Sequence, residues 1–131
     1  MRKNISSGSP FEPIIGFSRA VRVGNTIHIA GTAPVGAENE DISGQTRRIF
    51  AIAEKTLAEA GASFRDIVRT RIFLTRTEDW ETVGRIHGEF FADIRPVTTF
   101  VTVTGFINPA WRVEIEFDAA SPIPSLSERF L

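Results

Sequence analysis

Residues 19–32 read RAVRVGNTIHIAGT, and this stretch decides the fold. On both sides of Gly24-Asn25, apolar side chains alternate with other residues at the period of two that is typical of a β-strand. A Gly-Asn pair between two such runs favours the tight two-residue turn of a β-hairpin. We therefore predict strands over residues 19–23 and 26–32, joined by a hairpin.

Downstream of the hairpin, the hydrophobic period changes from that of a strand to that of a helix. The first helical stripe begins near Ser43, ends at the helix-terminating Gly61, and carries Ile49, Ile52, Ala53, Leu57 and Ala60. Asp79 is a suitable N-cap for a second helix, whose stripe comprises Trp80, Val83, His87, Phe90 and Phe91. Further strands are predicted over residues 67–75, 98–104 and 111–119. The order β-β-α-β-α-β-β predicts an α+β fold, with a single mixed sheet and both helices on one face.

Alternation along these strands assigns residues to the two faces of the sheet. The face toward the helices is expected to carry Val21, Val23, Ile27, Ile29, Val68, Ile72, Val101, Val103, Val113, Ile115 and Phe117. The opposite face is expected to carry Arg22, His28, Arg69, Arg71, Phe73, Phe100, Thr102, Glu114 and Glu116. This polar face is either an ordinary solvated face or a subunit interface with charges of both signs paired across it. The mixture of phenylalanines and threonines with those charges favours the interface.

Length and composition limit the possible classes of protein. A chain of 131 residues makes one domain, 1–131, with a Ser-, Gly- and Pro-rich arm over residues 1–15 and a tail over 120–131 that contains Pro122 and Pro124. The net charge of −1 gives no support to nucleic-acid or membrane binding. There is no cysteine, no secretory signal pattern and no run near the ~18 apolar residues of a membrane span. We therefore expect a cytoplasmic protein without a membrane partner.

Few motifs in the chain point to chemistry. Phosphate loops and the Gly-x-Ser-x-Gly elbow are absent, and His28 and His87 lack the partners of a metal motif, so no metal and no cofactor is expected. Packed, structural histidines are the default interpretation, with a pocket role as the alternative for His87. Glu114 and Glu116 share one face of a strand. Such a carboxylate either activates water in a pocket or forms an ion pair with Arg69 or Arg71.

The same segments, taken in order, resemble the RidA/YjgF family, also known as L-PSP endoribonucleases or translation inhibitors. The resemblance covers residues 14–119 and is carried by IIGFSRAVRVGNTIHIAGTAPV, EAGAS, DIVRTRIFLT, VGRIHGEFF, RPVTTFVTV and WRVEIEFDA. It implies a chorismate-mutase-like fold and a homotrimer with clefts between the subunits. It also implies a cofactor-independent hydrolase that converts 2-imino acids to 2-keto acids and ammonia, in which an arginine binds the substrate carboxylate and a glutamate holds the attacking water.

Carried over position by position, the resemblance places the water-holding glutamate on Glu114, the aromatic residue near the start on Phe17, and the glycine of the second strand on Gly31, followed by Thr32. The position of the carboxylate-binding arginine is Thr98, followed by Thr99 and Phe100. The helix position that is asparagine in the deaminases is Gly84. Threonine supplies neither a charge nor a bidentate fork. The substitution therefore predicts poor 2-imino acid deaminase activity.

Together these observations predict a trimer that binds a small molecule in an inter-subunit cleft. The cleft would be lined by Phe17, Gly31, Thr32, His87, Thr98, Thr99, Phe100 and Glu114, with Glu114 as the catalytic residue. It would hydrolyse an imine, an enamine or a related C–N bond. One alternative is a non-catalytic metabolite sensor that uses the same pocket. A weaker alternative is endoribonuclease or translation-inhibitor activity. Arg19 and Arg95 remain open as replacements for the missing arginine.

Overall fold

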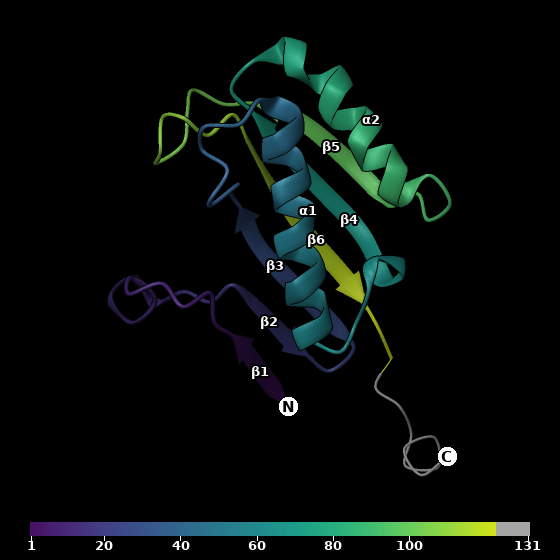
Figure 1. Ribbon diagram of the computed structural model, residues 1–131. Coiled ribbons are helices and arrows are strands. Elements are labelled where there is room, and N and C mark those ends of the chain that lie inside the picture. The colour runs from purple at the N-terminus through teal and green to yellow at the C-terminus, as the bar shows by residue number, and fades with distance from the viewer. Residues whose placement is uncertain (123–131) are drawn as a thin grey trace.

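The computed structural model describes residues 1–122, and it has two helices packed on one face of a six-stranded sheet (Figure 1). The helices are α1 (Ile42–Glu59) and α2 (Trp80–Phe91). The strands are β1 (Arg2–Ile5), β2 (Ala20–Val23), β3 (Thr26–Thr32), β4 (Ile67–Leu74), β5 (Val97–Thr102) and β6 (Val113–Ala120). The predicted α+β fold is therefore confirmed, with one more strand than the sequence indicated.

The strand order is β1-β2-β3-β6-β4-β5, and β4 and β5 are the only parallel pair among these strands. Val23 pairs with Thr26 across Gly24-Asn25, which confirms the predicted hairpin. Gly24 has a φ of 58°, a left-handed conformation that glycine adopts without steric cost. The crossover between the parallel strands is α2, which follows β4 and precedes β5. The last strand, β6, lies in the middle of the sheet, between β3 and β4, so its side chains lie among residues from several elements.

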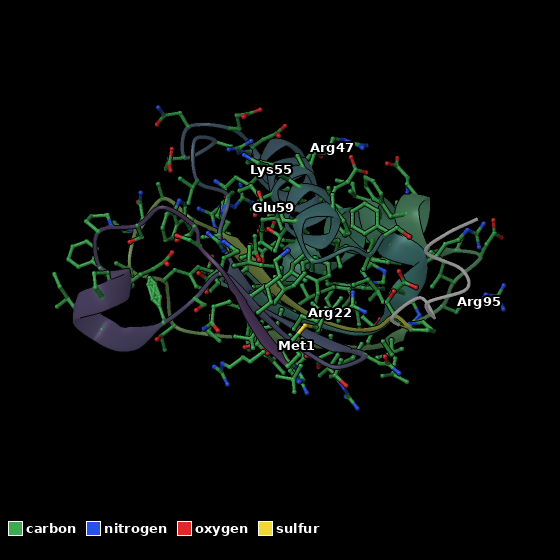
Figure 2. All side chains as sticks on the ribbon, turned by 90° about the horizontal axis from the view of Figure 1, so that it is seen from below. Met1, Arg22, Arg47, Lys55, Glu59 and Arg95 are labelled. Atoms are coloured by element: carbon green, nitrogen blue, oxygen red, sulfur yellow. The ribbon has the colours of Figure 1, made fainter. Side chains whose placement is uncertain are left out.

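The core lies between the sheet and the two helices. The Asp41 side chain caps α1 by accepting a hydrogen bond from the Gly44 amide at 2.9 Å. Phe50 of α1 is 1% exposed and contacts an aromatic cluster that includes Phe91 of α2 and Phe117 of β6. The cluster joins both helices to the centre of the sheet. Figure 2 shows the helices on one side of the sheet, and no helix of residues 1–122 covers the other side.

The predicted arm and the first residues of the predicted tail contain regular structure. The expected arm over residues 1–15 begins with β1, which pairs antiparallel with β2 and buries Ile5 to 4% exposure. The arm continues as a π-helical turn over Glu12–Gly16. At the other end, β6 includes Ala120, and Ser121 is buried; the rest of the predicted tail, residues 123–131, lies outside the described residues.

Arg22 lies on the helix side of the sheet, so its predicted place on the opposite face is wrong. The side chain is 6% exposed, and its guanidinium donates to the carbonyl oxygens of Gly24, Ala60 and Ser121 at 2.9, 2.7 and 2.6 Å. The alternation of β2 is therefore opposite to the one predicted, with Val21 and Val23 on the far face. Three backbone carbonyls offset the cost of burying this charge, and a sequence pattern contains no sign of them.

The predicted faces of β5 are also reversed. Phe100 is in register with the buried Ile72, and Thr102 with the buried Leu74, so both lie on the helix side, whereas Val101 faces away with Phe73. In β4, an irregularity between Ile67 and Arg69 leaves Val68 exposed, contrary to the prediction. β5 is an edge strand with all six residues exposed, so its apolar pattern carries no information about which face packs.

Candidate active site

Three of the predicted site residues, Phe17, Gly31 and Glu114, line one surface hollow of about 290 Å³. Phe17 comes from the segment that enters β2, Gly31 from β3 and Glu114 from β6. Arg19, which the sequence left open as a replacement for the missing arginine, and Trp111, which it did not single out for this site, line the same hollow. The hollow exists because β3 and β6 are neighbours in the sheet and the N-terminal segment passes beside them.

Glu114 is half-buried, and its carboxylate lies over Gly31. A Cβ atom placed on Gly31 would lie 3.7 Å from the Glu114 Oε2, so the glycine leaves the carboxylate open to the hollow. Burial is the main cause that raises the pKa of the Glu114 carboxyl above 4.5, the neighbouring charge of Glu116 raises it further, and Arg19 opposes the shift. Within residues 1–122, the Glu114 carboxylate makes no hydrogen bond and no ion pair. A proton acceptor of raised pKa, free of a partner, is suited to general base catalysis.

The alternative of an ion pair between Glu114 and Arg69 or Arg71 is therefore not found among the described residues. Arg71 lies 3.5 Å from the Glu116 carboxylate and 3.0 Å from that of Asp118, and the residue in register with Glu114 on β4 is Phe73. The paired charges on this face thus lie within the subunit. One of the paired acidic residues, Asp118, is absent from the sequence prediction.

Arg19 is the basic residue of the hollow. It is half-buried, and burial lowers the pKa of its guanidinium, while the charges of Glu12 and Glu114 act in the opposite direction. Strand alternation could have placed Arg19 in this hollow, because it follows Phe17 by two residues at the start of a strand and residues two apart share a face. The sequence left Arg19 and Arg95 as equal alternatives, and the structure places only Arg19 beside Glu114.

Thr98 and His87 lie together in a second groove, of about 380 Å³, that Arg95 also lines. The hydroxyl oxygen of Thr70 is 2.9 Å from the His87 Nε2 and 2.8 Å from the Thr98 hydroxyl. Burial lowers the pKa of His87 to about 4, so this imidazole is neutral at pH 7. Its ring also contacts Phe50 and Phe91, which agrees with the default interpretation of a packed structural histidine.

The remaining predicted residues lie elsewhere in the subunit. Thr32 is fully buried, with its hydroxyl donating to the Ala30 carbonyl at 2.9 Å. Thr99 is on the opposite face of β5 from Thr98, because it is in register with Arg71. The Phe100 Cζ would lie 3.8 Å from a Cβ on Gly84, so the ring of Phe100 lies against α2 at that glycine. Within one subunit the structure therefore brings together only part of the predicted cleft.

Two kinds of site are not found in the described part of the chain. Residues 1–122 contain no group of three or more His, Asp or Glu side chains placed to hold a metal ion. Neither α1 nor α2 is long and apolar enough to cross a membrane. The second histidine, His28, lies 2.8 Å from the Asp118 carboxylate on the uncovered face, away from His87.

Comparison with known proteins identifies the family. The Endoribonuclease L-PSP family model matches residues 8–121. A solved Mycobacterium tuberculosis member of the YjgF/YER057c/UK114 family is 47% identical with a TM-score of 0.86, covering 92% of this chain and 99% of that one. An uncharacterized Streptomyces coelicolor protein is 37% identical, with 89% of this chain and 90% of that protein covered. A Dermatophagoides farinae protein named 2-iminobutanoate/2-iminopropanoate deaminase is 30% identical, with 88% and 93% covered. The resemblance expected from the sequence is thus confirmed, and the chain belongs to the Endoribonuclease L-PSP, or YjgF/RidA, family.

Proposed function

We propose that this protein hydrolyses the C–N bond of a small imine or enamine without a cofactor, using water held by Glu114. The observation that carries the proposal is the half-buried Glu114 carboxylate, which lies open to a hollow over Gly31 and has no ion-pair partner within residues 1–122. A relative at 30% identity is named as an imine deaminase, which supports the same class of reaction.

The reaction needs one water molecule and one proton acceptor. The Glu114 carboxylate takes a proton from water as the water oxygen bonds to the imine carbon, which gives a tetrahedral carbinolamine. Glu114 passes this proton to the nitrogen, then takes the proton of the carbinolamine hydroxyl and passes it to the same nitrogen as the C–N bond breaks, so the products are a carbonyl compound and ammonia. A pKa raised toward the working pH suits a group that must accept a proton and return it.

We further propose that the active unit is a homotrimer assembled through the face of the sheet that the helices leave uncovered. That face combines paired charges, at Arg71, Glu116 and Asp118, with exposed apolar residues that include Val23 and Val101. Charges already paired within the subunit cost less to bury than isolated ones. In the assembly, Phe17, Gly31 and Glu114 of one subunit would meet the β5 residues Thr98 and Phe100 of its neighbour.

The 2-imino acids are expected to be poor substrates. The Thr98 hydroxyl is engaged with Thr70 at 2.8 Å and with the Pro96 carbonyl at 3.1 Å, so it offers a carboxylate neither a charge nor a free donor. A carboxylate placed against Thr98 would therefore give up its hydration without gaining a charged partner at that position.

Ammonia release from a panel of imines and enamines tests the proposal. Glu114→Gln keeps the shape of the side chain but removes the base, and it should lower turnover by ~10²-fold or more. At pH values above the pKa of Glu114, Glu116→Gln is the matched control, because it removes a carboxylate two residues away on the same face of the same strand. Equal turnover in wild-type protein and Glu114→Gln would contradict the proposed role of Glu114. Ligand binding without ammonia release would favour the metabolite sensor, and RNA affinity that falls steeply with salt would favour the endoribonuclease.

A further inference from the structure

We propose that Arg19 binds the anionic group of the ligand in the Glu114 hollow and thereby selects small substrates that carry a carboxylate. This inference rests on the proposed function, since it assigns a substrate class to the same hollow. The position at which the family resemblance implies an arginine is Thr98, so the charge-binding residue would have moved from β5 to the segment that enters β2.

The backbone holds Arg19 firmly at the rim of the hollow. Its amide donates to the Ile5 carbonyl at 2.8 Å, and its carbonyl accepts from the Ala30 amide at 2.9 Å. Arg19 is thus held on one side by the end of β1 and on the other by β3. Because both neighbours are strands of the same sheet, the base of the side chain is fixed relative to Glu114 on β6. Because the backbone of Arg19 is held in place, less conformational entropy is lost when its guanidinium binds a ligand.

The guanidinium of Arg19 has N–H donors that no described residue accepts. Among residues 1–122 it makes no hydrogen bond and no ion pair, although the side chain is half-buried and could present five N–H groups. The carboxylate of Glu12, which acts on Arg19 electrostatically, accepts hydrogen bonds from the amide and the hydroxyl of Ser7 instead. Glu114 likewise makes no direct ion pair with Arg19. A partly desolvated guanidinium with open donors is suited to a planar oxyanion such as a carboxylate, which it can hold with two parallel bonds.

The shape of the hollow agrees with a ligand that has one charged end. Phe17 and Trp111 provide apolar surface, Arg19 is the only basic residue among the described residues that line it, and Glu114 lies over Gly31. The carboxylate would bind Arg19 while the uncharged C–N group lies at the water held by Glu114. Anion binding and fast turnover of 2-imino acids remain separate properties, because turnover also requires the reacting carbon to lie within reach of that water.

Arg95 is the rival for this role and is less suited to it. Its side chain is exposed, its Nε donates to the Ala92 carbonyl at 2.9 Å, and it lines the Thr98 groove. Figure 2 shows Arg95 at the edge of the molecule, far from the N-terminal π-helical turn. An exposed cation gains little from binding an anion, because water and salt screen the attraction.

Calorimetry on the full-length protein tests the inference with two matched pairs of probes: 2-oxobutanoate against 2-oxobutanamide, and benzoate against benzamide. Wild-type protein should bind at least one carboxylate on the order of tenfold more tightly than its amide, the scale of one charge-assisted hydrogen bond. Arg19→Gln should abolish that preference, and Arg19→Lys should retain part of it. Arg47→Gln removes an arginine that pairs with Glu89 at 2.7 Å on the exposed side of the helices, and it should leave the preference unchanged. Thermal unfolding and light scattering of each variant establish that it is folded and assembled as the wild type is.

Three results would overturn the inference: no carboxylate preference in the wild type for either pair, an unchanged preference in Arg19→Gln, or a preference lost in Arg95→Gln but kept in Arg19→Gln. Failure of the proposed function looks different. Carboxylate binding that depends on Arg19, together with no ammonia release from any imine or enamine, would leave Arg19 as the anion-binding residue of a sensor. Ammonia release that depends on Glu114 but not on Arg19 would retain the hydrolase and discard the anion site.

Discussion

The hydroxyl oxygens of Thr98 and Thr70 lie 2.8 Å apart, so the residue at the position of the family's arginine is part of an internal polar chain. The chain continues from Thr70 to the Nε2 of His87 at 2.9 Å. Thr98 is itself exposed, whereas Thr70 is fully buried. The His87 imidazole in the groove beside β5 is neutral at pH 7, and the cation that acts on Glu114 is Arg19, in the segment that enters β2.

Introducing the missing arginine should strengthen carboxylate binding. Thr98→Arg places a guanidinium on β5 at a position that the proposed assembly would close against the neighbouring subunit, where two charge-assisted hydrogen bonds would be worth ~1.5–3 kcal/mol each. We expect 2-oxobutanoate to bind at least about tenfold more tightly to this variant than to the wild type, as measured by calorimetry. Thr98→Gln is the control for side-chain length without charge. Unchanged affinity in Thr98→Arg would show that position 98 does not reach the ligand in the assembled protein.

The decrease of turnover at low pH, the acid limb of the pH–activity profile, should reflect protonation of Glu114. Its carboxylate form is the active one, and its pKa is raised above 4.5, so turnover should fall as the pH drops through that raised value. Removing the like charge in Glu116→Gln should move the limb to lower pH. Removing the opposing cation in Arg19→Gln should move it to higher pH. The charges that bear on the group are those of Glu116, Arg19 and, through Arg19, Glu12, while Phe73 and Gly31 face it from β4 and β3. A limb that moves in neither variant would assign the titration to another residue.

His87 should make the folded protein sensitive to mild acid. Its pKa is lowered from 6.5 to about 4 in the folded state, because charging the buried imidazole is unfavourable. Above the unfolded pKa the group is neutral in both states and contributes no pH dependence. As the pH falls from 6.5 toward 4, the unfolded state takes up a proton that the folded state does not, so stability decreases.

Thermal unfolding of wild-type protein and His87→Gln at pH 7 and pH 5 measures this effect. The melting temperature should decrease more between pH 7 and pH 5 for the wild type than for the variant. Parallel losses in the two proteins would mean that His87 is not the titrating group.

Burial of Arg22 should make it a major contributor to stability. Arg22→Met keeps the length of the side chain but leaves the carbonyls of Gly24, Ala60 and Ser121 without their donor. Hydrogen bonds from a charged group contribute ~1.5–3 kcal/mol each, so we expect a loss of about 3 kcal/mol or more in unfolding free energy. Arg65→Met, at an exposed position, is the control. Denaturant unfolding of both variants gives the two values, and equal stability would contradict the proposed importance of these contacts.

Assembly through the uncovered sheet face predicts a particle of three 14.5 kDa subunits. Arg71→Glu removes the cation that pairs with Glu116 and Asp118 within the subunit, so it should weaken the assembly because unpaired negative charges would have to be buried. Light scattering measures both proteins across the micromolar range. A wild-type monomer at those concentrations would exclude the shared cleft, and the Glu114 hollow would then have to act within one subunit.

Local sequence by itself determined the elements and the family. Gly24 and Asn25 between two alternating runs predicted the hairpin, and Gly61 predicted the end of α1, whereas the N-cap Asp41 lies two residues before the predicted start at Ser43. The order of the motifs then indicated the Endoribonuclease L-PSP family, and the resemblance predicted Phe17, Gly31 and Glu114 as site residues, which line one hollow in the structure. These features depend on contacts within a few residues of the chain, and such contacts are visible in a linear pattern.

Tertiary structure alone decided which charged side chains have hydrogen-bond or ion-pair partners among the described residues and which do not. Arg22 matches an outward-facing position by alternation, but three carbonyls from distant segments draw it inward. Arg71 was an equal partner for Glu114 or Glu116, and the register of β4 against β6 directs it to Glu116 and Asp118. That register leaves Glu114 unpaired beside Arg19, a residue 95 positions earlier in the chain. Pairing between charges depends on distance in space, which the sheet sets through hydrogen bonds between strands remote in sequence, so no local pattern can encode it.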